Sequence, residues 1–173
     1  MNGSLLNTDE EVLQNTYNSL VSILTTIGFK HQVVAKSGGN NGHLYFFGTS
    51  KKTIDVESKK LSVTGRKVCI GNNLKFPEKL FILAHEVGHI VDYRRSLGRE
   101  EYLWQLLEPK TYERSHLNLK REKAAWVEAE KMLQSFGILP KWKNSFVNCR
   151  DECVKEYMTI TSKQSPPGFV KDL

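Results

Sequence analysis

The sequence has few of the features that would mark a secreted or a membrane protein. Only three of its 173 residues are cysteines, an odd and sparse set that does not make a disulfide framework. No apolar run approaches the roughly 20 residues that a bilayer-spanning helix needs. The first residues, Met1 to Leu6, lack the basic and hydrophobic segments of a secretory signal. We therefore expect a cytoplasmic protein that does not act at a membrane.

A dense basic run is also missing, although the net charge is +6. The basic residues are spread along the chain in pairs such as Lys51-Lys52 and Arg94-Arg95, and neither a helix-turn-helix nor a zinc-finger pattern is present. A solvated lysine-rich surface explains this distribution better than a nucleic-acid interface does. Binding to nucleic acid therefore stays an alternative that no motif supports.

The remaining composition, with 39% hydrophobic and 25% charged residues, is typical of one globular domain. A capping box that begins at Thr8 predicts a first helix over about 8–27, and Gly28 is a natural end for it. Short apolar or alternating runs between 29 and 72, separated by turn residues, predict a small antiparallel sheet of three to five strands.

Helical patterns dominate the rest of the chain. They predict helices over about 77–96, 100–107, 118–136 and 144–159, followed by a short non-helical tail over about 160–173. Gly137 and Pro140 are expected to lie beyond the end of the helix over 118–136. The order of helix, sheet and helices predicts an α+β fold in a single domain spanning 1–173.

The helix predicted over 77–96 carries the one motif with a clear chemistry, His85-Glu86-Val87-Gly88-His89. Residues four apart share a helix face, so both imidazoles can bind one zinc ion. Glu86 can then act as general base towards a water activated by the metal. Gly88 would let another element approach closely. The alternative is a pair of core histidines with a solvated glutamate, but charged residues in an apolar helix favour the zinc site.

Catalytic zinc sites use three protein ligands, and this motif supplies two. On the helix predicted over 118–136, Glu122 falls within the apolar stripe, Glu128 roughly opposite it and Glu130 at its edge. A carboxylate in a core-facing stripe needs a partner, which would be zinc or, alternatively, a buried arginine. We predict Glu122 as the third metal ligand. The other candidates are Asp92, expected in a supporting or surface position, and His116, expected at the surface.

These residues resemble the ImmA/IrrE family of small zinc peptidases. The similarity covers roughly residues 66–140: a short strand, then Leu83-Ala84 followed by the His-Glu-x-x-His motif, then Glu122 with Ala125-Trp126 and Ala129, leading to Leu139-Pro140. The resemblance implies a zincin-like fold, Zn²⁺ bound by His85, His89 and Glu122, and Glu86 as the catalytic base. The chain departs from larger members in having no helix-turn-helix and a longer spacing between His89 and Glu122.

The resemblance also implies a function. Members cleave transcriptional repressors, and many small stand-alone versions are encoded by phages and prophages. We therefore expect an intracellular zinc endopeptidase whose partner is a protein or peptide substrate, such as a transcriptional regulator. One alternative is a catalytically silent, zinc-stabilised binding protein that acts on a protein partner or DNA. Another is a zinc hydrolase with a non-peptide substrate. Tyr93 and Tyr112 are candidate donors to a developing oxyanion, with purely structural roles as the alternative.

Overall fold

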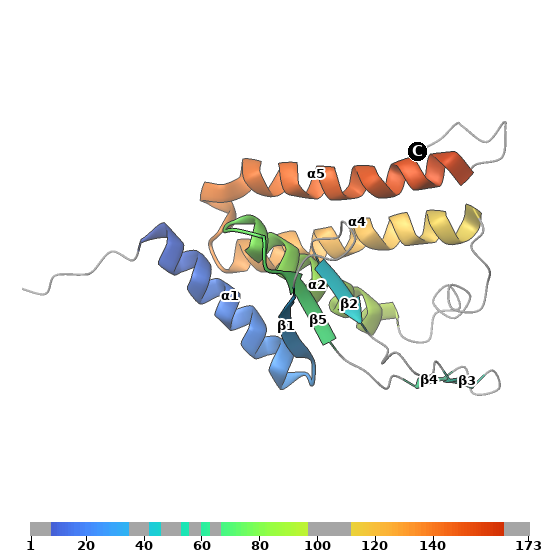
Figure 1. Ribbon diagram of the computed structural model, residues 1–173, viewed down its shortest axis with the longest axis horizontal. Helices are drawn as coiled ribbons and strands as arrows, with labels where there is room; N and C mark the ends of the chain where they lie inside the picture. Colours follow the sequence, from blue (N-terminus) through green and yellow to red (C-terminus); the bar gives the residue numbers. More distant parts are fainter. Residues whose placement is uncertain are drawn as a thin grey trace, which may run out of the picture.

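The structure is a computed structural model that describes residues 8–34, 42–45, 53–55, 60–62, 67–96 and 112–164. These residues form an α+β fold, as the sequence predicts (Figure 1). The helices are α1 (Asp9–Thr26), α2 (Glu78–Ser96), α4 (Tyr112–Ser135) and α5 (Leu139–Gln164). The strands are β1 (Lys30–Val34), β2 (Gly42–Tyr45), β3 (Thr53–Asp55), β4 (Lys60–Ser62) and β5 (Lys67–Gly71).

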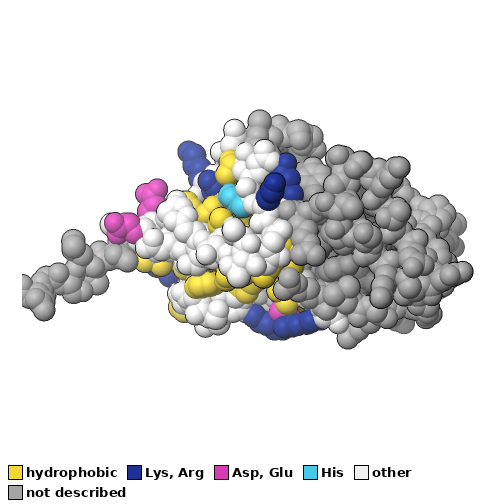
Figure 2. Space-filling view, turned by 90° about the horizontal axis from the view of Figure 1, so that it is seen from below, with side chains coloured by type: hydrophobic (Ala, Val, Ile, Leu, Met, Phe, Trp, Pro, Cys, Tyr) yellow, Lys and Arg dark blue, Asp and Glu magenta, His cyan; other side chains and the backbone are white. Residues whose placement is uncertain are grey.

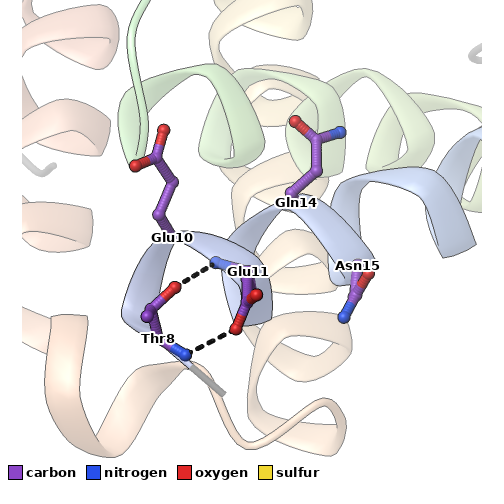
Figure 3. A pocket seen from close by; sticks show the side chains of 5 residues that line it. All are labelled: Thr8, Glu10, Glu11, Gln14 and Asn15. Atoms are coloured by element: carbon purple, nitrogen blue, oxygen red, sulfur yellow. Dashed lines mark hydrogen bonds between the residues drawn. The ribbon is translucent and has the colours of Figure 1, made fainter.

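The first helix, α1, begins where the capping box predicts. The Glu11 backbone N–H donates to the Thr8 hydroxyl oxygen at 3.3 Å, and the Thr8 backbone N–H donates to the Glu11 carboxylate at 2.7 Å (Figure 3). Two backbone donors that the helix leaves unpaired are satisfied in this way. The helix ends at Thr26, and Gly28 follows with a φ of 83°, which a residue without a side chain adopts at no steric cost.

The main sheet differs from the prediction. Its strand order is β1-β5-β2, and β1 pairs with β5 in the parallel direction, with Lys30 opposite Lys67 and Val34 opposite Gly71. Only β2 runs antiparallel to β5, while β3 and β4 form a separate antiparallel pair. The prediction of one antiparallel sheet is therefore wrong. The cause is topological: the relative direction of β1 and β5 is set by the path of the chain between residues 34 and 67, which no local pattern in either strand encodes.

The last two helices are longer than predicted. α4 begins at Tyr112, six residues earlier than the predicted start at 118, and α5 covers 139–164 instead of 144–159. Pro140 is the second residue of α5, where its missing N–H costs nothing, and does not lie in a connection beyond α4. The tail predicted over 160–173 is correspondingly wrong for 160–164. The helix predicted over 100–107 lies outside the described residues.

The core lies where α2, α4 and α5 meet, and α4 and α5 lie side by side (Figure 1). Phe81, Trp126 and Phe146 meet there in edge-to-face ring contacts, and all three are essentially unexposed. α1 packs against α2 through Leu13, Tyr17, Leu20 and Leu24, all of which are buried.

Two further observations concern membrane-spanning helices and the distribution of charge on the surface. None of the helices in the described part of the chain combines the length and the apolar character required to cross a membrane. On the face shown in Figure 2, the coloured Lys and Arg side chains lie in several separate places and not in one basic patch. The acidic side chains on this face gather beside the N-terminal segment, in keeping with Asp9, Glu10 and Glu11 in the first turn of α1.

Candidate metal centre

The motif helix α2 is buried along most of its length. Every residue from Leu80 to Gly88 is buried, and this stretch includes His85 and Glu86 with 6% and 5% of their surface exposed. A helix that is covered on all sides gains its stability from packing and not from one amphipathic face. Polar side chains held in such a helix must find partners inside the protein.

Helix α4 crosses α2 in direct backbone contact at Gly88. A Cβ atom built on Gly88 would lie 2.2 Å from the carbonyl oxygen of Ala125, well inside any tolerated contact. The close approach predicted at Gly88 is therefore confirmed. Glu122 lies three residues before Ala125, on the adjoining turn of α4, so this crossing brings its side chain to the two histidines.

Three side chains converge at the crossing. His85 Nε2 lies 3.0 Å from His89 Nε2 and 3.1 Å from Glu122 Oε2, and His89 Nε2 lies 3.3 Å from Glu122 Oε1. His85, His89 and Glu122 form the only group of three or more potential metal-ligating residues within the described ranges. The structure thus brings together the three residues predicted as ligands, and this group could hold a metal ion.

The spacing of the imidazole nitrogens and the carboxylate oxygens fits a tetrahedrally coordinated ion. Ligand atoms about 2.0–2.1 Å from zinc, at tetrahedral angles, lie about 3.3 Å from one another. The observed separations of 3.0–3.3 Å are close to that value. Hydrogen bonding alone suits the cluster poorly, because an ionised carboxylate only accepts and two imidazole nitrogens 3.0 Å apart can share only one proton. A bound cation could accept a lone pair from each imidazole and from the carboxylate at the same time.

Trp126 fixes the plane of the first histidine. The His85 ring stacks on the Trp126 indole with a centroid distance of 4.3 Å and an interplanar angle of 21°. His85 Nδ1 is buried and has no hydrogen-bond partner among the described residues. Packing, and not a hydrogen bond to the far nitrogen, therefore orients this imidazole so that Nε2 faces the cluster.

Glu86 is buried beside the cluster. Its burial raises the pKa of its carboxyl to about 7, a rise that the positive charge of His89 opposes and the negative charge of Glu122 reinforces. Cys69 on β5 is close enough that the charge of Glu86, after burial, contributes to a raised thiol pKa.

The cluster is arranged around an ionised Glu122. Burial raises the pKa of this carboxyl, but hydrogen bonds from His85 and His89 and their charges outweigh it and lower the pKa far below its usual value. Burial lowers the pKa of His85, whereas for His89 the hydrogen bond to Glu122 and the Glu122 charge outweigh burial and raise it. The site therefore carries a fixed negative charge between two imidazoles.

The other ligand candidates lie apart from this group. Asp92 pairs with Arg121 of α4 at 3.6 Å, and Glu130 pairs with Lys143. Glu128 was predicted opposite the core-facing stripe, yet it is buried, because Arg95 of α2 reaches over it. Lys131 from the next turn of α4 also pairs with it, at 2.8 Å.

The side chains of three further candidates, His116, Tyr93 and Tyr112, are not among those that the structure describes, so their predicted roles stay predictions.

Sequence reasoning missed two neighbours of the site. Trp126 was named only as part of the family resemblance, without its stacking on His85, and Arg121 was not considered at all. A signal for Arg121 existed: it directly precedes Glu122, and Asp92 lies three residues after His89 on a shared helix face.

Comparison of the chain with protein-family models, with curated proteins and with solved structures finds no match.

Proposed function

We propose that this protein is a zinc-dependent intracellular endopeptidase with a zincin-like arrangement of its site. The observation that carries the proposal is the convergence of His85 Nε2, His89 Nε2 and the two Glu122 carboxylate oxygens, with separations of 3.0–3.3 Å and with Glu86 buried beside them. Two imidazoles and one carboxylate are a ligand set of catalytic zinc sites, whereas calcium and magnesium prefer sets made of oxygens.

Each residue of the site has a distinct role in this proposal. His85, His89 and Glu122 would hold the ion with three ligands and leave a fourth position open. Zinc in such a site supplies Lewis acidity, which lowers the pKa of water towards about 7 and polarises a carbonyl. Glu86 would serve as general base towards the attacking water and then as general acid towards the leaving amine. Trp126 holds His85 in the orientation that the ion requires.

The substrate class rests on the resemblance to the ImmA/IrrE peptidases, whose members cut transcriptional repressors. We propose a protein substrate of this kind.

The test combines metal analysis with cleavage. Wild type, Glu86→Gln and Glu122→Ala are purified side by side, their zinc content is measured, and each is incubated with the repressors encoded in the same genome. We expect one zinc in wild type and in Glu86→Gln, little in Glu122→Ala, and cleavage by wild type alone. Mass spectrometry of the products identifies the cut bond.

Glu128→Gln is the matched control, because Glu128 is also a buried glutamate but lies outside the cluster. It should retain both zinc and cleavage. If wild type binds zinc and Glu86→Gln has the same biological activity as wild type, the proposed enzymatic activity is wrong. The protein would then be a zinc-stabilised binding protein. A wild type that takes up no zinc would remove the metal centre itself.

A further inference from the structure

Among the described side chains, two arginine–carboxylate ion pairs join the crossing helices α2 and α4, and they differ in burial. Asp92 and Arg121 lie 3.6 Å apart, with 20% and 19% of their side chains exposed. In the second pair, Glu128 has 12% of its side chain exposed but its partner Arg95 has 62%. Water screens an exposed arginine and leaves it free to move, so the Arg95 pair restrains the helices only weakly.

The better-buried pair adjoins the metal cluster on both helices. Arg121 directly precedes Glu122 on α4, and Asp92 follows His89 by three residues on α2. Glu128, by contrast, lies seven residues beyond Arg121, about 10 Å farther along α4.

The geometry of the crossing creates a need for such a pair. The backbone contact of Gly88 with Ala125 fixes the distance between the two helices at this point but does not by itself fix the angle between them. Glu122 reaches the histidines at the end of a long side chain, so a small turn of α4 moves its carboxylate away from them. A contact on the Glu122 side of the crossing restricts such a turn, and Asp92–Arg121 lies on that side.

We propose that Arg121 and Asp92 are positioning residues of the metal centre, whose ion pair holds the Glu122 turn of α4 in register with the His89 turn of α2. The inference rests on the metal centre proposed above and adds two residues that do not touch the ion. Groups that orient metal ligands without binding the metal typically contribute 10- to 100-fold to metal affinity.

The test is the zinc dissociation constant of the full-length protein, measured by competition with a chelator of known affinity. Arg121→Gln and Asp92→Asn should each raise that constant by about tenfold or more. Arg121→Lys keeps the positive charge and should stay within about threefold of wild type, because a pair 3.6 Å apart depends on charge more than on a bidentate fork. The double variant should be no weaker than the weaker single variant, since both remove one interaction.

Glu128→Gln is the control for helix packing in general, because it breaks the other pair between the same helices. It should leave the zinc constant within about twofold of wild type, whatever it does to the melting temperature of the metal-free protein. Circular dichroism of each metal-free variant checks folding. The absorption bands of the Co²⁺-loaded proteins, which report ligand geometry, should change in Arg121→Gln and not in Glu128→Gln.

Each outcome decides between the two proposals. Wild-type zinc affinity in both Arg121→Gln and Asp92→Asn would overturn the positioning role and leave the metal centre intact. An equal loss in Glu128→Gln would also overturn it, because the effect would then belong to helix packing as a whole. A wild-type protein without zinc affinity would overturn the metal centre and the positioning role together.

Discussion

Two groups of side chains in the described part of the chain contain histidine: the first cluster is Tyr17 with His31, and the second cluster is His85 and His89 with Glu122. They differ in whether the available protons can complete a hydrogen bond at every close contact. Between α1 and β1, the Tyr17 hydroxyl lies 2.7 Å from His31 Nε2, so one proton between two atoms completes the pair. Between α2 and α4, two imidazole nitrogens lie 3.0 Å from each other and 3.1–3.3 Å from the oxygens of one carboxylate, and if both imidazoles donate to the carboxylate, no acceptor remains between the two N–H groups. The first cluster is complete as it stands, and the second could hold a metal ion.

The surrounding charges reinforce the difference. The Lys79 ammonium lies 5.3 Å from the centre of the Tyr17 ring, so the first cluster already has a positive charge beside it. The second contains an ionised carboxylate at its centre. A buried histidine alone therefore says little about function, whereas the count of protons and the sign of the neighbouring charge separate a structural histidine from a candidate metal ligand.

The largest expected effect comes from moving the helices that build the second cluster. In Gly88→Ala, the new Cβ atom would lie 2.2 Å from the Ala125 carbonyl oxygen, so α2 and α4 must separate by about 1 Å. We expect a loss of about 1–3 kcal/mol in the free energy of unfolding, measured by urea denaturation. Because Glu122 moves away from the histidines, zinc affinity should fall more than tenfold.

Gly137→Ala is the matched control. Gly137 follows α4 with a φ of +72°, and a Cβ atom added there would meet no other atom within 4 Å, so alanine at this position costs backbone strain alone. It should destabilise the protein by about 1 kcal/mol and leave zinc affinity unchanged. Equal zinc affinity in Gly88→Ala and wild type would show that the close crossing does not position Glu122.

The next effect in size separates the clusters by their response to metal. Zinc at 100 times its dissociation constant should stabilise wild type by about 2.7 kcal/mol, seen as a melting temperature higher by several degrees. Glu122→Ala should lose this shift, because it removes one of three ligands and the central negative charge. Tyr17→Phe, which breaks the first cluster and retains the ring, should melt lower than wild type but gain the same shift. A zinc response that depends on Tyr17 would contradict the distinction.

The sequence predicted the second cluster well because its determinants are local or periodic. Two histidines four apart in a helix must share a face, and Glu122 belongs to an apolar stripe that repeats along α4. The start of α1 at Thr8 follows from four consecutive residues. Each of these features is encoded within a single helix.

The features that were missed depend on contacts between distant segments. The parallel pairing of β1 with β5 depends on strands more than thirty residues apart, and Glu128 is buried by Arg95, which comes from another helix. Residues 112–117 extend α4 where no apolar stripe marks the helix, so periodicity placed its start too late. The Asp92–Arg121 pair belongs to the same class, since only the crossing of two helices brings its members together.

The smallest expected effect concerns the first cluster and acid. Burial, and then the charge of Lys79, lower the pKa of His31 in the folded protein, so folding favours the neutral imidazole. The unfolded chain therefore binds more protons in the window below the ordinary histidine pKa of about 6.5. The stability that His31 contributes should be complete above this value and decline as the pH falls through the window, by at most about 1.4 kcal/mol per pH unit for one proton.

The measurement is the free energy of unfolding of metal-free protein between pH 7.5 and 5, compared with His31→Gln, which does not titrate. The difference between the two curves isolates His31 from the histidines of the second cluster, which both proteins share. Nuclear magnetic resonance of the imidazole protons gives the pKa of His31 directly. A pKa at or above the ordinary value, or parallel stability curves, would mean that the Tyr17–His31 pair is not held in its neutral form and that the contrast between the clusters lies in charge alone.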